Sequence, residues 1–343
     1  MIDFSAATLS SLAIHYIGSK SGDEGCRLSE EVVHLNETIS SLLVSFFTKS
    51  FRMQEIYQFA HETSLEFNEI YSAARAVLLK RDDLLHQSAT IARHLYSVSD
   101  HPNIKSGELY VAFLQKCQYE GNYVDAIGIF KSEQKDTYLK VFPEGKSYHV
   151  NEDLGININK LDKGCVVFNT GEQDGYRALV VDNLNRDEAR YWKDQFLKVK
   201  PHDNAYSNTR NYMQLCRQFA IEAFPEAEKL DQVGLIRESA RFFEEEDTFD
   251  KQKFEDHVLQ EPELVEAFHQ YKHEFEQRNA VDIQDEFEID AMAVKNLKRV
   301  FKSVIKLDKN FHIYVHGDRN LIRKGYDEES HLHFYQLYFK SES

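Results

Sequence analysis

The sequence contains few of the residues and motifs that mark common functional classes. Its four cysteines lie far apart and form no C-x-x-C pair, which excludes zinc-ribbon and dithiol redox motifs. Without a run of about eighteen apolar residues or a signal peptide, we expect a cytosolic protein that spans no membrane. The motifs G-x-x-x-x-G-K-[ST], G-x-G-x-x-G, G-x-S-x-G and H-E-x-x-H are also absent, so an enzyme is not expected.

Positive charge is scarce overall, but it is concentrated in one segment. The chain has 41 Lys and Arg against 57 Asp and Glu, a net charge of -16 that opposes binding to a polyanion. Residues 222–290 hold 22 acids and 7 cations, whereas residues 295–324 hold only two acids. The nine cations of this second segment, called here the basic cluster, are Lys295, Lys298, Arg299, Lys302, Lys306, Lys309, Arg319, Arg323 and Lys324.

The basic cluster predicts a surface that contacts phosphate groups. On a helix beginning near Asp290, the cations from Lys295 to Lys306 recur every three or four residues and share one face. Three nearby tyrosines can stack on unpaired bases: Tyr314, Tyr326 and Tyr335. Alternatively, this cationic face docks on the acidic helices of the same chain, and charge patterning leaves both interpretations open. A second basic stretch around Trp192, with Arg186, Arg190, Lys193, Lys198, Lys200 and Arg210, is more typical of a solvated helix face.

The hydrophobic pattern predicts an α+β fold. Helices are expected over 29–47, 67–78 and 84–95, because apolar residues recur there at helical spacing. Short runs rich in β-branched and aromatic residues then follow, joined by turns too short for crossover helices, which indicates an antiparallel sheet. We expect three segments: an α+β domain over 1–224, an acidic helical segment over 225–290 with a break near 244–250, and a basic helix with a β-hairpin over 291–343.

Three weaker patterns point to metal or catalytic chemistry. Glu266, His269, His273 and Glu276 share one helical face, opposite an apolar stripe, and a solvated face is the favoured interpretation. His312, His316, His331 and His333 lie on two strands that are expected to be neighbours, where packing in a sheet is the usual role. Finally, Asp125, Glu133 and Lys135 partly match the acid and E-x-K pattern of a magnesium-dependent nuclease.

Several stretches of the chain resemble the bacterial nucleoid-associated proteins of the NdpA type. They are 101–105 with the strand 109–114, Asn151 to Asn159, Arg190-Tyr191-Trp192, the helix around 210–224, and the tail 304–313. The resemblance implies a cytoplasmic protein of the nucleoid that binds duplex or single-stranded DNA with little sequence preference. It also implies no cofactor, and raises topoisomerase subunits as protein partners. The alternatives to DNA binding are a protein interaction module and a metal-dependent nuclease.

Overall fold

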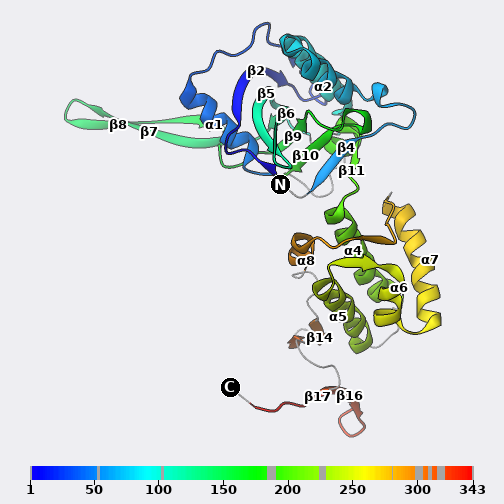
Figure 1. Ribbon diagram of the computed structural model, residues 1–343. Helices are drawn as coiled ribbons and strands as arrows, with labels where there is room; N and C mark the ends of the chain where they lie inside the picture. The colour runs from blue at the N-terminus through cyan, green and yellow to red at the C-terminus, as the bar shows by residue number, and fades with distance from the viewer. Residues whose placement is uncertain are drawn as a thin grey trace. The chain divides into compact units, whose positions relative to one another are not determined.

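The computed structural model describes residues 2–51, 55–101, 104–183, 191–223, 229–279, 281–297, 304–307, 311–314 and 321–341 (Figure 1). The chain separates into two compact units, Met1–His202 and Asp203–Ser343. The α+β class expected from the sequence is confirmed, since helices accompany sheets whose strand pairs are all antiparallel. None of the described helices is long and apolar enough to cross a membrane.

The first unit is built on a nine-stranded antiparallel sheet. Its order is β11-β4-β10-β9-β6-β5-β2-β3, and β1 also pairs with β5. The strands are β1 Ile2–Asp3, β2 Thr8–Ile17, β3 Cys26–Arg27, β4 Ile56–Phe59, β5 Gly107–Tyr119, β6 Asn122–Ser132, β9 Lys163–Phe168, β10 Arg177–Asp182 and β11 Val199–Pro201. The predicted turns at Gly121 and Gly175 join β5 to β6 and β9 to β10, so these two hairpins are confirmed.

Both faces of this sheet are buried. Because side chains alternate along a strand, Leu109, Val111 and Phe113 enter one core while their neighbours Tyr110 and Ala112 enter the other. The first core lies under α2 (Glu69–Leu79), α3 (Leu84–Val98) and the π-helix Tyr191–Leu197, and the second under α1 (Glu37–Thr48). The nearly continuous apolar run of β5 is therefore the pattern of a central strand covered on both sides.

Helix α1 begins later than the apolar pattern predicts. The sequence favours a helix from about residue 29, but the helix begins at Glu37. The side chain of Asn36 accepts a hydrogen bond from the backbone N–H of Ile39 at 2.9 Å and so satisfies one of the open donors of the first turn. The local cap determines this boundary, because apolar spacing alone contains no signal for where a helix starts.

A buried histidine links β2 to α3 in the first unit. His15 accepts a hydrogen bond at Nδ1 from the backbone N–H of Ser29, at 3.0 Å, and its Nε2 lies 2.8 Å from Ser88 Oγ. The Ser88 hydroxyl donates to the carbonyl of Leu85, so Nε2 must carry the proton and the ring is neutral. Burial lowers the pKa of His15 below its ordinary value of 6.5, and the positive charge of Arg93 adds to this effect.

Acidification is therefore expected to destabilise the first unit. Burial also lowers the pKa of His94, so the unfolded chain takes up protons before the folded one as the pH falls below 6.5. As the pH falls from 6.5 toward the lower pKa of the folded state, the free energy of unfolding should decrease. Each histidine contributes at most about 1.4 kcal/mol per pH unit to this decrease. Urea unfolding can be measured at about pH 7.5 and about pH 5.5 by the fluorescence of Trp192, the single tryptophan, which is buried in this unit. His15→Gln should flatten the pH profile, and a wild type equally stable at both values would contradict the assignment.

Strands β7 (Asp136–Glu144) and β8 (Ser147–Gly155) form a separate hairpin that projects from the sheet of the first unit (Figure 1). They pair with each other from Asp136↔Gly155 to Glu144↔Ser147, and with no other described strand. The turn at Gly145 has φ 59° and is the turn expected from the sequence. Every residue of β7 is exposed, so this hairpin, called here the arm, contributes nothing to either core of the unit.

The second unit is mostly helical. Its helices are α4 Ala205–Glu222, α5 Lys229–Glu245, α6 Lys251–Phe254, the π-helix Glu255–Leu259, α7 Pro262–Asn279 and α8 Ala291–Leu297. Asn204 caps α4 in a reciprocal capping box with Ser207. The apolar faces meet in one aromatic core around Tyr212. Because that core includes the buried face of α4, the unit begins at Asp203, ahead of the boundary that the sequence places near residue 224.

The break expected near 244–250 contains a strand that the sequence analysis missed. Strand β12 (Thr248–Asp250) pairs with β13 (Glu286–Glu288), and Phe249 lies opposite Phe287. Three-residue strands with one apolar residue between polar residues present no repeating pattern, so only the pairing of their rings across the core identifies them. The rest of the unit consists of two more antiparallel pairs, β14 (Val304–Leu307) with β15 (Phe311–Tyr314) and β16 (Ile322–Asp327) with β17 (Leu332–Leu337).

Candidate nucleic-acid interface

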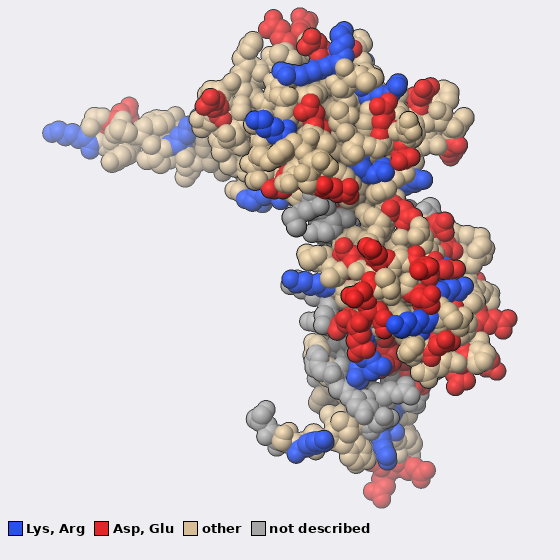
Figure 2. Space-filling view, viewed as in Figure 1, with Lys and Arg blue, Asp and Glu red and all other residues tan. Residues whose placement is uncertain are grey.

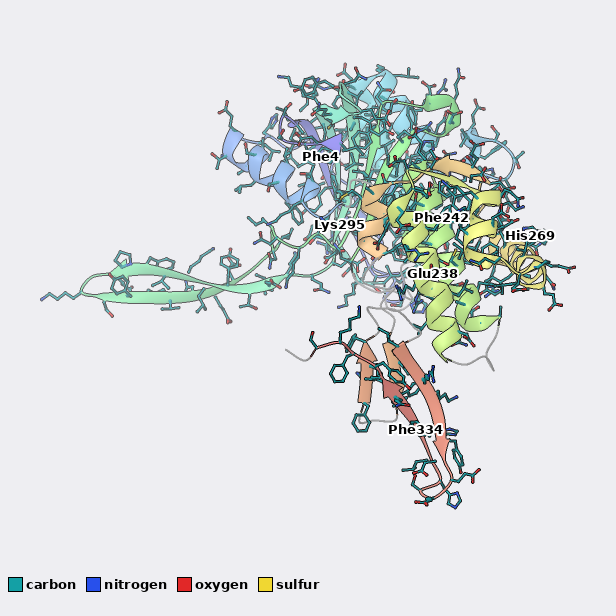
Figure 3. The ribbon with its side chains drawn as sticks, turned by 60° about the horizontal axis from the view of Figure 1, so that its bottom comes forward. Phe4, Glu238, Phe242, His269, Lys295 and Phe334 are labelled. Atoms are coloured by element: carbon teal, nitrogen blue, oxygen red, sulfur yellow. The ribbon has the colours of Figure 1, made fainter. Side chains whose placement is uncertain are left out.

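The structure describes four members of the basic cluster, all in the second unit. Lys295 is exposed on α8, and Arg323 and Lys324 are exposed on β16. Lys306 lies in β14, where only its backbone is described. The other five members lie outside the described residues: Lys298, Arg299, Lys302, Lys309 and Arg319. Figure 3 labels Lys295 on α8 and Phe334 on β17.

The prediction of one continuous cationic helix is wrong for Lys306. Asp290 caps α8 by accepting hydrogen bonds from the backbone N–H groups of Met292 and Ala293, so the predicted start is confirmed, but Lys306 stands in a strand opposite His312. Its neighbour Ile305 is 2 % exposed and packs against Val233 of α5. The β-branched residues of this segment favour a strand, and burial of the Ile305 side chain stabilises that conformation.

A small apolar cluster holds the C-terminal strands together in the second unit. Ile305 and Val233 pack with partly buried side chains from all four strands: Leu307, Ile313, Ile322 and Tyr335. Tyr335 is therefore part of the packing, whereas Tyr314 and Tyr326 stay about half exposed. The Arg323 guanidinium lies 5.5 Å from the ring centre of Tyr338, a cation–π contact that leaves its N–H groups able to bind an anion.

The histidines of these strands do not form the arrangement that the sequence suggests. The strand containing His312 pairs with β14, and the strand containing His333 pairs with β16, so the two are not neighbours in a described sheet. His331 Nδ1 lies 3.3 Å from the hydroxyl of Tyr326, and the His333 ring packs on the same tyrosine. His316 lies outside the described residues. Packing is the role that these contacts support.

Acidic side chains crowd the helical part of the second unit (Figure 2). Several of them pair with cations from the same helices: Lys272 with Asp285 at 2.7 Å, Arg278 with Glu222 at 3.2 Å, and Lys253 with Glu246 at 2.5 Å. Lys295 makes no ion pair with any described residue. Within the described part of the chain, therefore, the acidic helices do not neutralise Lys295 by direct contact.

The histidine face of α7 is not a metal site. His269 pairs with Glu255 at 2.6 Å, whereas His273 bonds to Gln277. Glu276 accepts a hydrogen bond from the backbone of Ile283. Three of the four candidate ligands thus have separate partners, and no group of three His, Cys, Asp or Glu residues in the described chain is arranged to hold a metal ion.

The nuclease pattern is not assembled either. Asp125 lies near the start of β6 and Glu133 follows its end, so more than about 20 Å separates them at 3.3 Å per residue. A shared magnesium ion would require both carboxylates within a few ångströms. Lys135 instead pairs with Glu108 at 2.6 Å. The three residues that match the nuclease pattern in the sequence therefore do not form a catalytic site.

Glu133 belongs to a buried group of charges that the sequence analysis did not find. Its carboxylate lies 2.8 Å from the ammonium of Lys131, and both side chains are at most 3 % exposed. A second pair, Lys163 with Asp182 at 2.8 Å, is buried to the same degree. The Asp162 carboxylate accepts hydrogen bonds from the backbone N–H groups of residues 133 and 134. Such pairs leave little charge open to a ligand, and their role is structural.

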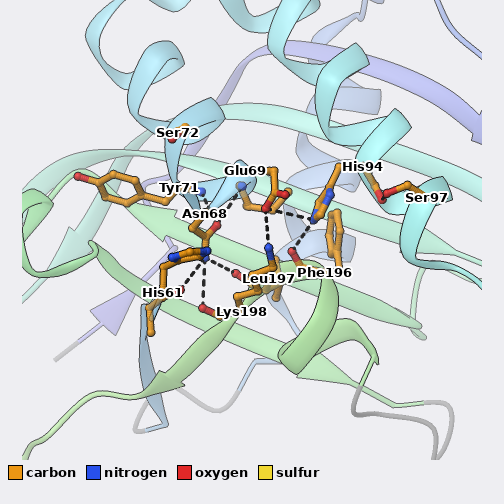
Figure 4. Close-up of polar contacts among 12 residues, drawn as sticks. His61, Asn68, Glu69, Tyr71, Ser72, His94, Ser97, Phe196, Leu197 and Lys198 are labelled. Carbon is orange, nitrogen blue, oxygen red and sulfur yellow. Dashed lines mark hydrogen bonds and ion pairs between the residues drawn. The ribbon is translucent and has the colours of Figure 1, made fainter. Parts of the chain in front are cut away.

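A further polar group joins the π-helix to α2 and α3 (Figure 4). Asn68 caps α2 and donates hydrogen bonds to the carbonyls of Ala60, Leu197 and Lys198. Lys198, from the second basic stretch, pairs with Glu69 at 2.8 Å. Lys193 of the same stretch bonds to a tyrosine hydroxyl, while Arg186 and Arg190 lie outside the described residues. Lys193 and Lys198 thus make contacts within the unit, and the helix expected here is a π-helix that ends at Leu197 and is followed by β11, which includes Lys200.

Comparison with known proteins agrees with the resemblance seen in the sequence. A family model described as "Nucleoid-associated protein YejK" matches residues 13–332, which is nearly the whole chain and includes parts of both units. A search of curated proteins finds no match. Since the match extends far beyond half of the chain, this protein belongs to the YejK family of nucleoid-associated proteins.

Proposed function

We propose that this nucleoid-associated protein binds DNA without catalysing a reaction, and that the basic cluster of residues 295–324 is its phosphate-binding surface. The proposal rests on two members of the basic cluster that the structure describes. Lys295 and Arg323 are exposed, and neither forms an ion pair with a described residue. Several carboxylates of the acidic helices pair with cations of the same unit.

Contacts of this kind supply affinity but little sequence specificity. Ammonium and guanidinium groups neutralise phosphates, whereas base recognition requires side chains positioned in a groove by a recognition element. No such element is evident in the sequence of 295–324. At about 0.15 M salt the screening length is roughly 8 Å, so a local cationic surface can attract phosphate although the whole chain carries -16. Asp327 ends β16, and Glu328 and Glu329 follow it in the hairpin turn, so the proposed surface ends at Lys324.

A salt titration with charge-reversed variants tests this proposal. Binding to duplex and single-stranded DNA is measured from about 50 to about 200 mM salt for the wild type and for Lys298→Glu/Arg299→Glu/Lys302→Glu. Each contact contributes about -0.9 to the slope of log K against log salt on duplex DNA, so loss of three contacts should make the slope shallower by nearly 3. The affinity at low salt should fall roughly tenfold to a hundredfold.

The matched control is Lys49→Glu/Lys105→Glu/Lys160→Glu, three exposed lysines of the first unit. Both triple variants change the net charge by the same amount, so only a local surface distinguishes them. Equal losses in the two variants would refute the site and leave a bulk charge effect. Unchanged binding in both would favour a protein partner, such as a topoisomerase subunit, as the target of this surface. Cleavage of DNA with magnesium present would contradict the non-enzymatic assignment.

A further inference from the structure

The arm has one polar face and one apolar face. Alternate residues of a strand point to opposite sides, and directly paired residues share a side. The register Val141↔Val150 therefore assigns eight side chains to one face: Thr137, Leu139, Val141, Pro143, Tyr148, Val150, Glu152 and Leu154. Seven of them are uncharged and mostly apolar, and all eight are exposed. The largest exposed fractions belong to Tyr148 at 72 %, Leu139 at 68 % and Leu154 at 64 %.

The polar face, in contrast, is satisfied within the arm itself. Lys140 pairs with Asp153 at 2.6 Å, and the hydroxyl of Tyr138 donates to the same carboxylate. These contacts hold the pKa of Asp153 below its ordinary value, chiefly through the hydrogen bond from Lys140. The Phe142 ring stacks on His149. These cross-strand contacts stabilise the conformation of the hairpin. Its apolar face is therefore ordered, although no described residue packs over it.

An isolated two-stranded hairpin is marginally stable in water, and an exposed apolar face of this length marks an interaction site. Nucleic acid does not fit this face. The arm carries Asp136, Glu144, Glu152 and Asp153 against only Lys140 and Lys146, so its net charge is -2 and it repels phosphate. A protein surface of the same apolar character is the partner that fits.

We propose that a second copy of this chain covers the apolar face of the arm, with two arms stacked face to face around a two-fold axis near Val141 and Val150. An interface between identical copies must be complementary to itself, and a flat apolar ribbon meets that condition. Stacking the arms in opposite directions places the two acidic bodies at opposite ends of a ribbon roughly 30 Å long, at about 3.4 Å per residue. It also brings Glu152, the one charged residue on the face, toward Lys146 near the tip of the other copy.

The available area predicts a weak dimer. Five large side chains that are 54–72 % exposed present on the order of 100 Å² each, so two stacked faces bury roughly 1,000 Å² in total. This value is at the lower limit for a specific interface, and we expect dissociation in the micromolar range, about 1–100 µM. Because each copy carries -16, screening should strengthen the dimer as salt rises. DNA binding should respond to salt in the opposite direction, which separates this inference from the proposed function.

Two adjacent substitutions provide a matched test. Val150→Glu and Asn151→Glu add the same charge to neighbouring exposed residues of β8, but on opposite faces of the arm. Sedimentation of the full chain over a concentration series should show a wild-type dimer, a dissociation constant raised roughly tenfold or more by Val150→Glu, and little change with Asn151→Glu. Circular dichroism should show both variants folded, because neither side chain belongs to a core.

Cysteine cross-linking gives a second measurement at the proposed axis. Val141→Cys should form a disulfide-linked dimer on mild oxidation, whereas Asn151→Cys should stay at the wild-type background. The native thiols of Cys117, Cys165 and Cys216 are buried and that of Cys26 is partly buried, so the wild type measures the background that Cys26 gives. A wild type that remains monomeric at about 100 µM would overturn the proposal and assign the face to another partner. Equal weakening by the two glutamate variants would overturn it as well.

Discussion

Glu133→Gln is expected to lower the free energy of unfolding of the first unit by about 3–5 kcal/mol. The substitution keeps the size of the side chain but leaves the ammonium of Lys131 in a site where it is 0 % exposed. Burial already lowers the pKa of Lys131, and the Glu133 carboxylate is the main charge that opposes this. The remaining partner of the ammonium is the backbone carbonyl of Lys105, at 2.7 Å.

Deprotonation of the lysine sets the upper limit of this effect. Neutralising an amine with an ordinary pKa of 10.5 at about pH 7 costs about 5 kcal/mol, so a larger loss would require damage to the fold itself. Urea unfolding followed by Trp192 fluorescence measures the change, because that side chain is buried in the same unit.

The double variant Lys131→Met/Glu133→Gln is the informative control. Removing both charges takes away the buried, unpaired ammonium, and most of the lost stability should return. A single variant as stable as the wild type would show that Lys131 is not buried as described. A double variant no better than the single one would mean that the loss came from Glu133 alone, for example from its hydrogen bond with Tyr191.

Phe249→Ala is expected to cost the second unit about 3–5 kcal/mol. The ring is 0 % exposed and lies 4.0 Å from the ring centre of Tyr212 and 4.8 Å from that of Phe287. Its removal leaves a cavity where β12 meets the helices, and it removes the pairing of aromatic rings that joins β12 to β13. Helical circular dichroism during thermal unfolding measures the loss.

Phe311→Ala is the matched control, because the same ring at that position is 66 % exposed. Its removal should change stability by less than about 1 kcal/mol. Trp192 fluorescence reports the first unit separately in both variants, since that unit has its own two cores. Equal destabilisation by the two substitutions would contradict the assignment of Phe249 to the centre of the second core.

The periodicity of apolar residues was sufficient to predict a helix wherever that helix buries one face along its whole length. The helices around residues 67–78 and 84–95 were predicted from apolar residues at helical spacing, and the central strands β5, β6, β9 and β10 from runs rich in β-branched and aromatic residues. It failed at α1, where the Asn36 cap determines the start, and at β12, which is too short to show a period. It also failed at Lys306, where helical spacing of cations continued into a segment that burial of Ile305 holds as a strand.

The candidate sites divide in the same way. The excess of cations over 295–324 is a property of composition, and it is evident without coordinates. Glu133 and Lys135 matched a nuclease pattern in the sequence, yet the structure uses them in ion pairs with Lys131 and Glu108. The nuclease pattern did not reveal these pairs, because Lys131 is not part of the pattern and Glu108 comes from another strand, β5.

Composition and periodicity determined the α+β class, the central strands and the separation of acidic from basic segments, and particular stretches of residues resembled the nucleoid-associated proteins. Tertiary structure alone decided that two lysines are buried in ion pairs, that α4 joins the second core, and that the apolar face of the arm is left open to solvent. The physical reason is that alternation specifies which side chains share a face. Whether that face is covered depends on contacts between residues far apart in the chain.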